Sequence, residues 1–482
     1  MQRPPKTSAE PARRGVNARG LTEGSIPRAI VGIALPTWGA FITHDLLGIV
    51  DMFFVGKLGP VAVASVAMSS LMFGIIMMVS QGIAAGTTAL VANAIGKGDR
   101  ARAEDIVGQS LAISSILAVF VAALGLLLAE DLLRLLGASE EVSAMGAGYL
   151  RIVAGGSITM MLMMIFGAAL RAAGDARTPF KAMVFSNAVN IVLDPIFIFG
   201  WLGMPALGVP GSAWATLVGR SVGLVIMVKV FFGGTHEHFH LRLRGLRPRA
   251  GAMRQIAGIG IFASGRMLLR NIGGLLLMRL VAMFGTVAVA AYGIGMRLQM
   301  LVFGPSMGFG TAAAALVGQN VGAGKPKRAE KSAWLAAAMA CTIVACVSLV
   351  FWFFGGRVVA VFNDDPQVVA TGATLLRWFS ISFVFLSLTF VLSHAMTGGG
   401  DTLFPMLIVG ASLILVGVPL AYVLAKVWGD VQGVWAAMAC SNFVAGLLSV
   451  GAFRHGRWRT VGQRIRQAGP PEPKPIKALR QK

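Results

Sequence analysis

The chain has 482 residues, of which 56% are hydrophobic and only 13% are charged. Soluble domains carry about 25% charged residues, so this composition excludes an ordinary soluble protein. The formal net charge of +22 does not indicate a nucleic-acid partner either. The basic residues lie in the two termini and in every second loop between apolar segments, which is the distribution that orients a membrane protein.

The N-terminal residues 1–25 are polar and rich in Arg and Pro. They lack the short apolar core and cleavage site of a secretory signal, so we expect a basic cytoplasmic tail. Twelve apolar segments follow that are long enough to cross a bilayer as helices. The predicted spans are about 29–55, 63–92, 106–129, two that flank 171–181, then 211–232, 256–281, 288–316, 333–354, 369–396, 403–426 and 432–453.

The loops between these segments alternate in charge. Loops 96–102, 171–181 and 325–331 are basic, whereas 130–143 is acidic. Basic loops face the cytoplasm, so an even number of spans places both termini there. We therefore expect an all-α polytopic membrane protein. Its expected parts are a basic tail at 1–25, a six-helix bundle at 26–232, a basic cytoplasmic linker at 233–254, a second six-helix bundle at 255–453 and a basic cytoplasmic tail at 454–482.

The two halves of the chain repeat with a constant offset. Gly-Pro-Val-Ala-Val-Ala from Gly59 matches Gly-Thr-Val-Ala-Val-Ala from Gly285, and Asn-Ala-Ile-Gly from Asn93 matches Gln-Asn-Val-Gly from Gln319. Both pairs are 226 residues apart. Two bundles with the same orientation are related by a pseudo-twofold axis along the membrane normal. Transporters use such repeats for alternating access, with sites near the midplane.

One apolar segment carries polar groups on a single face. Asn187, Asn190 and Asp194 are spaced i, i+3 and i+7, which brings them to one side of a helix. Pro195 lacks an N–H, so the carbonyl of Ile191 loses its usual helical partner. These groups predict a cation or proton site, because a charge at the bilayer centre costs roughly 2.5–3.5 kcal/mol. The alternative is a helix end at which Asp194 reaches water.

The acidic residues within the predicted spans are Asp45, Asp51 and Asp194, and all three lie in the first half. We therefore expect ion coupling in the first bundle. His44 shares a helical face with Asp51 and is expected to line a cavity, whereas Asp45 is turned by about 120° from Asp51. Asp45 belongs either to the site or to polar helix packing. The alternative for Asp51 is an interfacial acid.

The second half carries cations where the first half carries acids. Arg266 and Arg270 are four residues apart in the seventh span, and the repeat places Arg270 opposite His44. These arginines could counter the carboxylates of the first half or meet an anionic group of a substrate. A structural role is the alternative.

Other patterns do not indicate an enzyme or a metal protein. His236, His238 and His240 alternate in a loop that we expect to be solvated rather than metal binding. Cys341, Cys346 and Cys440 lie in predicted spans, which favours packing over disulfides. No nucleophile–base pair has a plausible enzyme setting. We expect no catalytic residue, no metal and no cofactor.

Several motifs together resemble the multidrug and toxic compound extrusion (MATE) family, and the resemblance covers almost the whole chain outside the tails and the 233–254 loop. The matching stretches are Leu35-Pro36, Val50-Asp51, Phe54 to Gly59, Arg171 to Pro179, Asn190 to Gly200, Gly208 to Thr216 and Val317 to Lys325.

This resemblance implies a V-shaped pair of six-helix bundles that exports drugs and organic cations in exchange for protons or sodium ions. The chain is similar to the DinF-like branch, which places the cation site in the first bundle. The residues implied are Asp51, Asn190, Asp194 and Thr216 for the cation, and His44, Met183 and Asn187 for the substrate. To the substrate set we add Asp45 and Arg270. Arg270 stands where NorM-like members carry an acid, which weakens the expectation of a second cation site and of a purely cationic substrate.

The main hypothesis is a secondary antiporter in the bacterial cytoplasmic (inner) membrane that exports amphipathic drugs, organic cations or metabolites in exchange for H⁺, or alternatively Na⁺. Its expected partners are the small-molecule substrate and membrane lipid, and it is expected to be a monomer. The second hypothesis is a flippase of lipid-linked or anionic precursors, which the arginines of the seventh span would serve. A membrane enzyme or a passive channel has no motif to support it.

Overall fold

The computed structural model describes residues 19–234, 236–241 and 247–467. Within this part every secondary-structure element is a helix, which confirms the all-α prediction. The helices of the first half are α1 (Arg19–Thr22), α2 (Ile26–Gly56), α3 (Pro60–Lys97), α4 (Arg100–Leu135), α5 (Glu140–Gly155), α6 (Ser157–Ala172), α7 (Arg177–Phe199), the 3-10 turn η1 (Trp201–Gly203) and α8 (Val209–Phe232).

The second half repeats this arrangement. Its helices are α9 (Ala250–Ala282), α10 (Thr286–Gly322), α11 (Pro326–Ala360), α12 (Pro366–Gly398), α13 (Leu403–Val409), the π-helical segment η3 (Gly410–Gly417), α14 (Val418–Trp428), α15 (Gln432–His455) and α16 (Arg457–Gln467). α13, η3 and α14 together form one continuous span, Leu403–Trp428.

The helices account for the expected membrane spans. Eleven described segments are long and apolar enough to cross a membrane. α5 and α6 make the twelfth when they count as one span, bent by 44° between them. The bend lies at Gly156, where an added Cβ would be 2.3 Å from the side chain of Leu217 in α8. The absence of a side chain at this glycine therefore permits close packing of the broken span against α8.

The internal repeat is visible in the backbone. Gly59 and Gly285 precede α3 and α10 with φ of 105° and 88°, and Gly98 and Gly324 follow the same helices with φ of 80° and 75°. Residues with a Cβ rarely adopt a positive φ. The 226-residue offset of the sequence is thus also the offset of the turns that begin and end equivalent helices.

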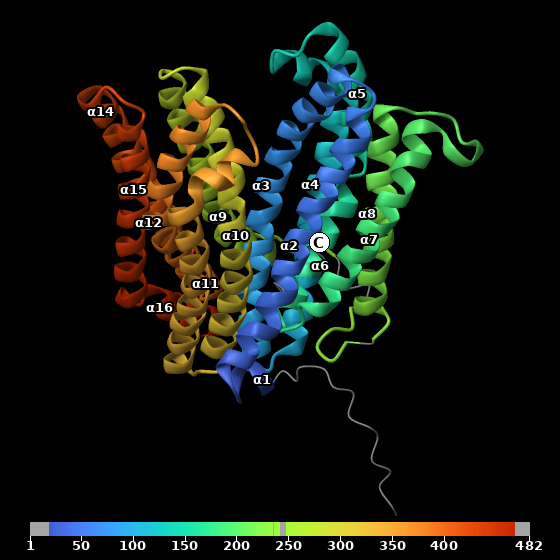
Figure 1. The fold of residues 1–482 in the computed structure, drawn as a ribbon. Coiled ribbons are helices and arrows are strands. Elements are labelled where there is room, and N and C mark those ends of the chain that lie inside the picture. Colours follow the sequence, from blue (N-terminus) through green and yellow to red (C-terminus); the bar gives the residue numbers. More distant parts are fainter. Residues whose placement is uncertain (1–18, 235, 242–246, 468–482) are drawn as a thin grey trace, which may run out of the picture.

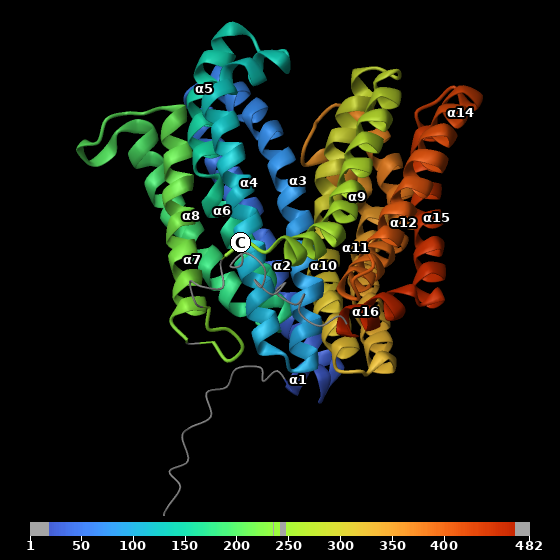
Figure 2. The same ribbon diagram turned by 180° about the vertical axis from the view of Figure 1, so that it is seen from behind.

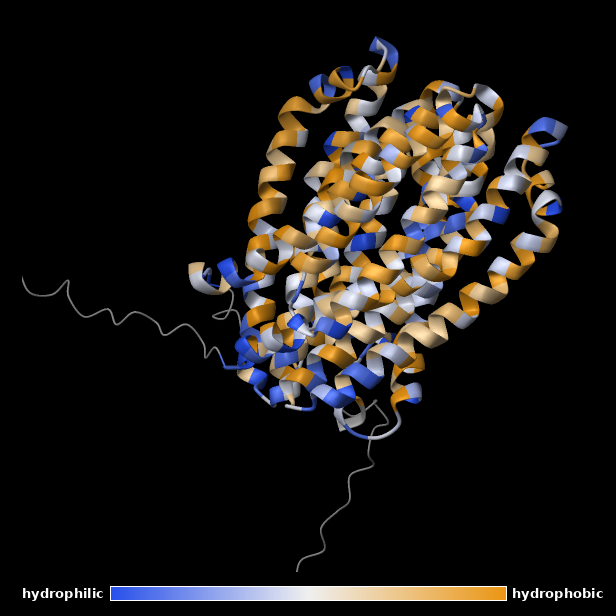
Figure 3. Ribbon diagram, turned by 90° about the vertical axis from the view of Figure 1, so that its left-hand side faces the viewer, coloured by the Kyte–Doolittle hydropathy of each residue, from blue (hydrophilic) through white to orange (hydrophobic). Residues whose placement is uncertain are grey.

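The helices form two lobes. Figure 1 shows α2 to α8 in blue to green on the right and α9 to α15 in yellow to red on the left, and Figure 2 shows the same division from behind. The two lobes lie closer together at the lower end of these views than at the upper end. Figure 3 shows hydrophobic residues over most of the helix length and hydrophilic residues gathered at the helix ends, as expected for a bilayer-spanning bundle.

The lobes touch at the end of the bundle that carries the basic loops 96–102, 171–181 and 325–331, here called the basic end. A Cβ on Gly96 would lie 2.0 Å from the carbonyl oxygen of Gln319, and a Cβ on Gly322 would lie 2.1 Å from that of Asn93. Asn93 and Gly96 are the repeat equivalents of Gln319 and Gly322. The repeated motif is therefore the point at which α3 and α10 meet across the pseudo-twofold axis.

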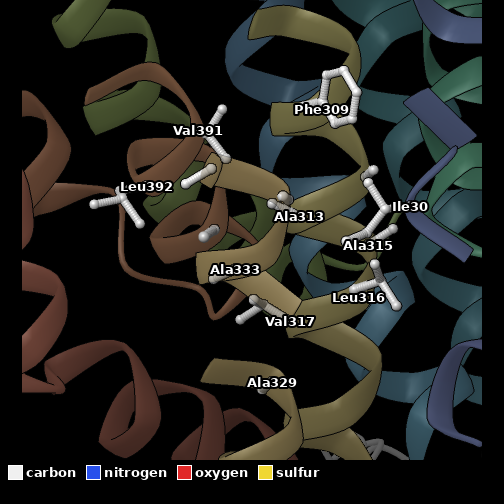
Figure 4. Packing of buried hydrophobic residues seen from close by; sticks show 14 of the residues in the cluster. Ile30, Phe309, Ala313, Ala315, Leu316, Val317, Ala329, Ala333, Val391 and Leu392 are labelled. Atoms are coloured by element: carbon white, nitrogen blue, oxygen red, sulfur yellow. The ribbon is translucent and has the colours of Figure 1, made fainter. Parts of the chain in front are cut away.

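The first half of α2 is embedded in the second lobe. Ile26 and Ile30 of α2, with Leu21 of α1, belong to the same buried cluster as residues of α10, α11 and α12. Figure 4 shows Ile30 beside Phe309 and Leu316 of α10, with Ala333 and Val391 in the same core. The second half of α2 packs with the first lobe, where Val55 lies in a cluster with residues of α3, α7 and α8. α2 thus connects the two lobes.

The C-terminal stretch 454–482 was expected simply as a basic tail, but residues 457–467 form α16, which bridges the lobes at the basic end. Asn93 Nδ2 of α3 donates to the carbonyl of Gly462 (3.2 Å). On the other side, Arg459 pairs with Glu330 of α11 (2.8 Å), and Trp458 is fully buried in the core of the second lobe. Residues 457–467 are too polar to be predicted as a membrane span, so the sequence did not indicate this helix.

We expect Trp458→Ala to destabilise the folded protein by about 3–5 kcal/mol, since it removes a large, fully buried side chain and leaves a cavity. The midpoint of thermal unfolding in detergent, measured for wild type, Trp458→Ala and Arg464→Ala, checks this. Arg464 is exposed on the same helix, so its variant should unfold with the wild type. Equal midpoints for all three proteins would show that α16 does not contribute to the folded core.

Candidate functional site

The polar face predicted on α7 is buried. Asn187, Asn190 and Asp194 are 6%, 2% and 0% exposed, whereas Ile191 and Val192 between them are 39% and 61% exposed. The i, i+3, i+7 spacing therefore directs the polar groups into the lobe and the apolar residues away from it, as predicted. α7 continues through Pro195 to Phe199. Asp194 does not reach water, so the alternative of a solvated helix end is wrong.

Glycines of α8 position this face against its neighbours. A Cβ on Gly219 would lie 2.6 Å from the carbonyl oxygen of Ser186 and 3.1 Å from Cβ of Asn190, and a Cβ on Gly211 would lie 2.5 Å from the carbonyl oxygen of Phe197. The two helices can approach this closely only because these positions lack side chains. The close approach brings the hydroxyls of α8 against the polar groups of α7.

Asn190 links Asp194 to Thr216. In the amide orientation that satisfies most groups, Asn190 Nδ2 donates to Asp194 Oδ2 (3.2 Å). Its Oδ1 accepts from the backbone N–H and the hydroxyl of Thr216 (2.9 and 3.2 Å). The other carboxylate oxygen, Asp194 Oδ1, is buried and has no hydrogen-bond partner. The structure thus brings three of the four predicted cation-site residues together and leaves one carboxylate oxygen unsatisfied.

Asp51 joins the same cluster from α2. Its carboxylate accepts a hydrogen bond from the Ser212 hydroxyl of α8 (2.5 Å). Asp51 and Asp194 interact electrostatically, and Asp51 also interacts with Arg220 of α8. Tyr149 of α5 lies within electrostatic range of both acids and of Arg220. The polar cluster of the first lobe therefore contains residues from four helices, α2, α5, α7 and α8.

Sequence reasoning did not find Ser212, Tyr149 and Arg220. Arg220 had a usable signal, because it is a charged residue in the middle of the apolar segment 211–232. Its guanidinium also lies over the ring of Phe73 at 5.1 Å. Ser212 and Tyr149 gave no such signal in the sequence, since a single hydroxyl in an apolar segment is common. Only the packing of helices places these two residues beside an acid.

The predicted substrate residues lie beside this cluster on α2 and α7. Asn187 Nδ2 donates to the carbonyl of Thr43 (3.0 Å), which holds α7 against α2 next to His44. His44 is exposed and interacts electrostatically with Arg220 and Asp45. Met183, one turn before Asn187, is half-buried. Asp45 is exposed and forms no hydrogen bond or salt bridge with any other described residue.

Arg270 lies apart from these residues, in the second lobe. Its guanidinium is 4.1 Å from the ring centre of Phe303 and 5.6 Å from that of Phe390. It forms no ion pair with Asp45 or with any other acid in the described part of the chain. The arginines of α9 therefore do not counter the carboxylates of the first lobe in this conformation.

The histidine loop lies at the basic end, away from the cluster. His236 Nε2 is 3.7 Å from Asp175 Oδ2, and the His236 ring stacks on Phe239 at 5.3 Å. Burial lowers the pKa of His236, with the Asp175 carboxylate acting in the opposite direction. Within residues 236–241 the loop is thus packed partly against the protein, whereas His240 is exposed as expected. His236 is half-buried, and Phe239 is fully buried.

The geometry can be compared with known proteins. The MatE family model matches the chain twice, at residues 36–196 and 263–423. The chain belongs to the MatE family. The two matches cover most of the two lobes, which agrees with the internal repeat. As a MatE protein the chain is a multi-pass membrane transporter and not an enzyme.

Relatives of this MatE protein carry names that refer to different substrates. The chain is 27% identical over 453 residues to a probable multidrug resistance protein NorM of Thermotoga maritima, covering 92% of this chain and 96% of that one. It is 25% identical over 433 residues to an FAD transporter of Shewanella oneidensis, covering 89% and 94%. A solved transporter of the MOP superfamily from Pyrococcus furiosus, described as having a binding pocket of reverse polarity, matches with a TM-score of 0.85 and 25% identity, covering 93% of this chain and 99% of that one.

Proposed function

We propose that this MatE protein is a secondary antiporter that exports amphipathic drugs, organic cations or metabolites in exchange for protons, with sodium as the alternative ion. The proposed cation site is in the first lobe, at Asp51, Asn190, Asp194 and Thr216. No cofactor other than the coupling ion takes part. The names of the relatives, a probable multidrug resistance protein and an FAD transporter, support a small-molecule cargo.

The observation that carries this proposal is the unsatisfied oxygen of Asp194. A buried carboxylate oxygen without a partner costs roughly 1–3 kcal/mol, and more when the group is charged. A second carboxylate, Asp51, lies within electrostatic range and adds repulsion when both are ionised. A proton or a metal cation placed between these acids would relieve both costs. A site of this kind binds a cation in one state of the cycle and releases it in another.

α2 connects the proposed cation site to both lobes. Asp51 near its second end is bonded to Ser212 of the first lobe, while Ile30 near its first end is embedded in the second lobe. Between them, Trp38 lies against Gly304 of α10. Protonation of Asp51 would weaken its bond to the first lobe, so we propose that α2 shifts with the protonation of the cluster and changes how the lobes pack.

The proposed setting is a monomer in the bacterial cytoplasmic membrane with both termini in the cytoplasm and lipid around the exposed apolar faces. The positions of the basic loops and of α16 at one end of the bundle support this orientation (Figure 1). The substrate residues proposed are His44, Asp45, Met183, Asn187 and Arg270. The flippase of an anionic precursor stays the second candidate, because Arg266 and Arg270 lie unpaired in the second lobe.

The test is ethidium efflux from proteoliposomes under an imposed pH gradient or an imposed sodium gradient. We expect efflux driven by the pH gradient alone, and efflux driven by sodium alone would change the ion and keep the antiporter. No ethidium movement under either gradient, by protein that elutes as a single folded species, would contradict drug antiport and favour the flippase. Expression in a sensitive strain should likewise raise tolerance to ethidium.

A further inference from the structure

Two arginines of α9 lie directly above the contacts between the lobes. Ser264 Oγ of α9 donates to the carbonyl of Met78 in α3 (3.1 Å), which is a contact between the lobes. Arg266 and Arg270 follow within the next two turns of α9, about halfway along this helix. Phe303 of α10 lies next to Gly304, the glycine that touches Trp38 of α2. Arg266, Arg270 and Phe303 therefore lie close to the residues through which the two lobes are in contact.

The arginines have no negative partner in their own lobe. All five acidic residues of the lobe lie at helix starts or in loops (Glu330, Asp364, Asp365, Asp401 and Asp430). Neither guanidinium forms a hydrogen bond or an ion pair with another described residue. His394 of α12 interacts electrostatically with Arg266, but its Nδ1 is held by the Phe390 carbonyl at 2.9 Å and it supplies no negative charge. Two half-buried cations side by side thus lack a counter-charge.

The aromatic rings leave the guanidinium edge of Arg270 free. The group lies over the face of Phe303 at 4.1 Å, with Phe390 at 5.6 Å. An arginine can stack on an aromatic face and still bind a carboxylate or phosphate through its edge N–H groups. Arg266, one turn earlier on the same helix, adds a second set of donors. The rings beside the guanidinium are a surface for an apolar or aromatic group joined to that anion.

We propose that Arg266 and Arg270, with Phe303 and Phe390, bind the anionic group of an aromatic amphipathic substrate. This inference deepens the proposed function, on which it rests, by assigning a substrate class: an aromatic compound with a carboxylate, sulfonate or phosphate. The acids of the first lobe then remain for the coupling cation, and the charge of the substrate is met in the second lobe.

The test compares two dyes that share one ring system and differ in charge. Carboxyfluorescein is the anionic probe and rhodamine 123 the cationic one, and binding to purified protein is measured by fluorescence anisotropy without any gradient. We expect Arg270→Gln to weaken carboxyfluorescein binding about tenfold or more, as for a lost hydrogen bond to a charged group. Arg266→Gln should act in the same direction. Arg270→Lys keeps the charge without the planar fork and should weaken binding less than Arg270→Gln.

Arg279→Gln is the matched control, because Arg279 is an exposed arginine of the same helix. It should bind both dyes as wild type does, and rhodamine 123 should not bind more weakly to Arg270→Gln. Wild type that does not bind carboxyfluorescein, or equal affinities in wild type and both Arg→Gln variants, would overturn the proposal. Because the binding assay uses no gradient, the two proposals can fail separately. Ethidium antiport without carboxyfluorescein binding would contradict only this inference. Carboxyfluorescein binding without any gradient-driven transport would contradict only the antiporter.

Discussion

Asp194→Asn is expected to slow gradient-driven ethidium efflux strongly while leaving the protein folded. Asn has nearly the shape of Asp and keeps the bond to Asn190, but it carries no charge and cannot take up or release the coupling cation. The initial rate should fall about 100-fold, near the upper end of the usual coupling between two sites. The measurement is the efflux rate from proteoliposomes that contain equal amounts of wild type or variant.

Asp131→Asn is the control, because Asp131 is an exposed acid of the same lobe at the opposite end from the basic loops. It removes the same charge and should export ethidium at the wild-type rate. The Asp194→Asn protein should also be at least as thermally stable as wild type, since the atom that replaces the unsatisfied carboxylate oxygen carries no charge. Wild-type efflux by Asp194→Asn would contradict the role given to this residue.

Gly322→Ala is expected to slow transport by opposing closure of the basic end. The added Cβ would lie 2.1 Å from the backbone oxygen of Asn93, so α3 and α10 have to move apart. Overpacking costs about 1–3 kcal/mol, which lowers the share of molecules closed at this end by about tenfold. Efflux should fall in proportion, because the closed basic end is one of the two states of alternating access.

A distance measurement at the other end of the bundle reports this shift. Spin labels replace Glu140 and Asp364, which are exposed on the two lobes at the acidic end, in a protein whose native cysteines have been removed. Gly322→Ala should shift the distance distribution to shorter values than wild type. Gly258→Ala, at a helical glycine with no atom within 4 Å of the added Cβ, should match wild type. Identical distributions in all three proteins would show that the close contact does not control the conformation.

The features that could be predicted from the sequence are those that follow from a regular spacing of residues along the chain. Apolar length gave the spans, the constant offset gave the two related lobes, and helical spacing alone brought Asn187, Asn190 and Asp194 to one buried face. Each of these patterns lies within one helix or compares a helix with its repeat. They need no knowledge of which helices are neighbours.

The remaining features depend on packing between helices. The bond from Ser212 to Asp51 joins α8 to α2, and no spacing within either helix predicts it. The stacking of Arg270 on Phe303 joins α9 to α10, and no spacing in the sequence records it. Sequence reasoning also overlooked α16, whose residues are too polar to be read as a span although Trp458 is fully buried.

In an antiporter the coupling cation and the substrate favour opposite states of the cycle, so a cation bound at Asp194 is expected to weaken substrate binding. The most direct measurement is the affinity of purified protein for ethidium as a function of pH and of sodium concentration, in wild type and in Asp194→Asn. The account predicts that acid, or sodium, weakens ethidium binding to wild type and that the variant loses this dependence. An affinity of wild type that is independent of both cations, or the same dependence in the variant, would contradict it.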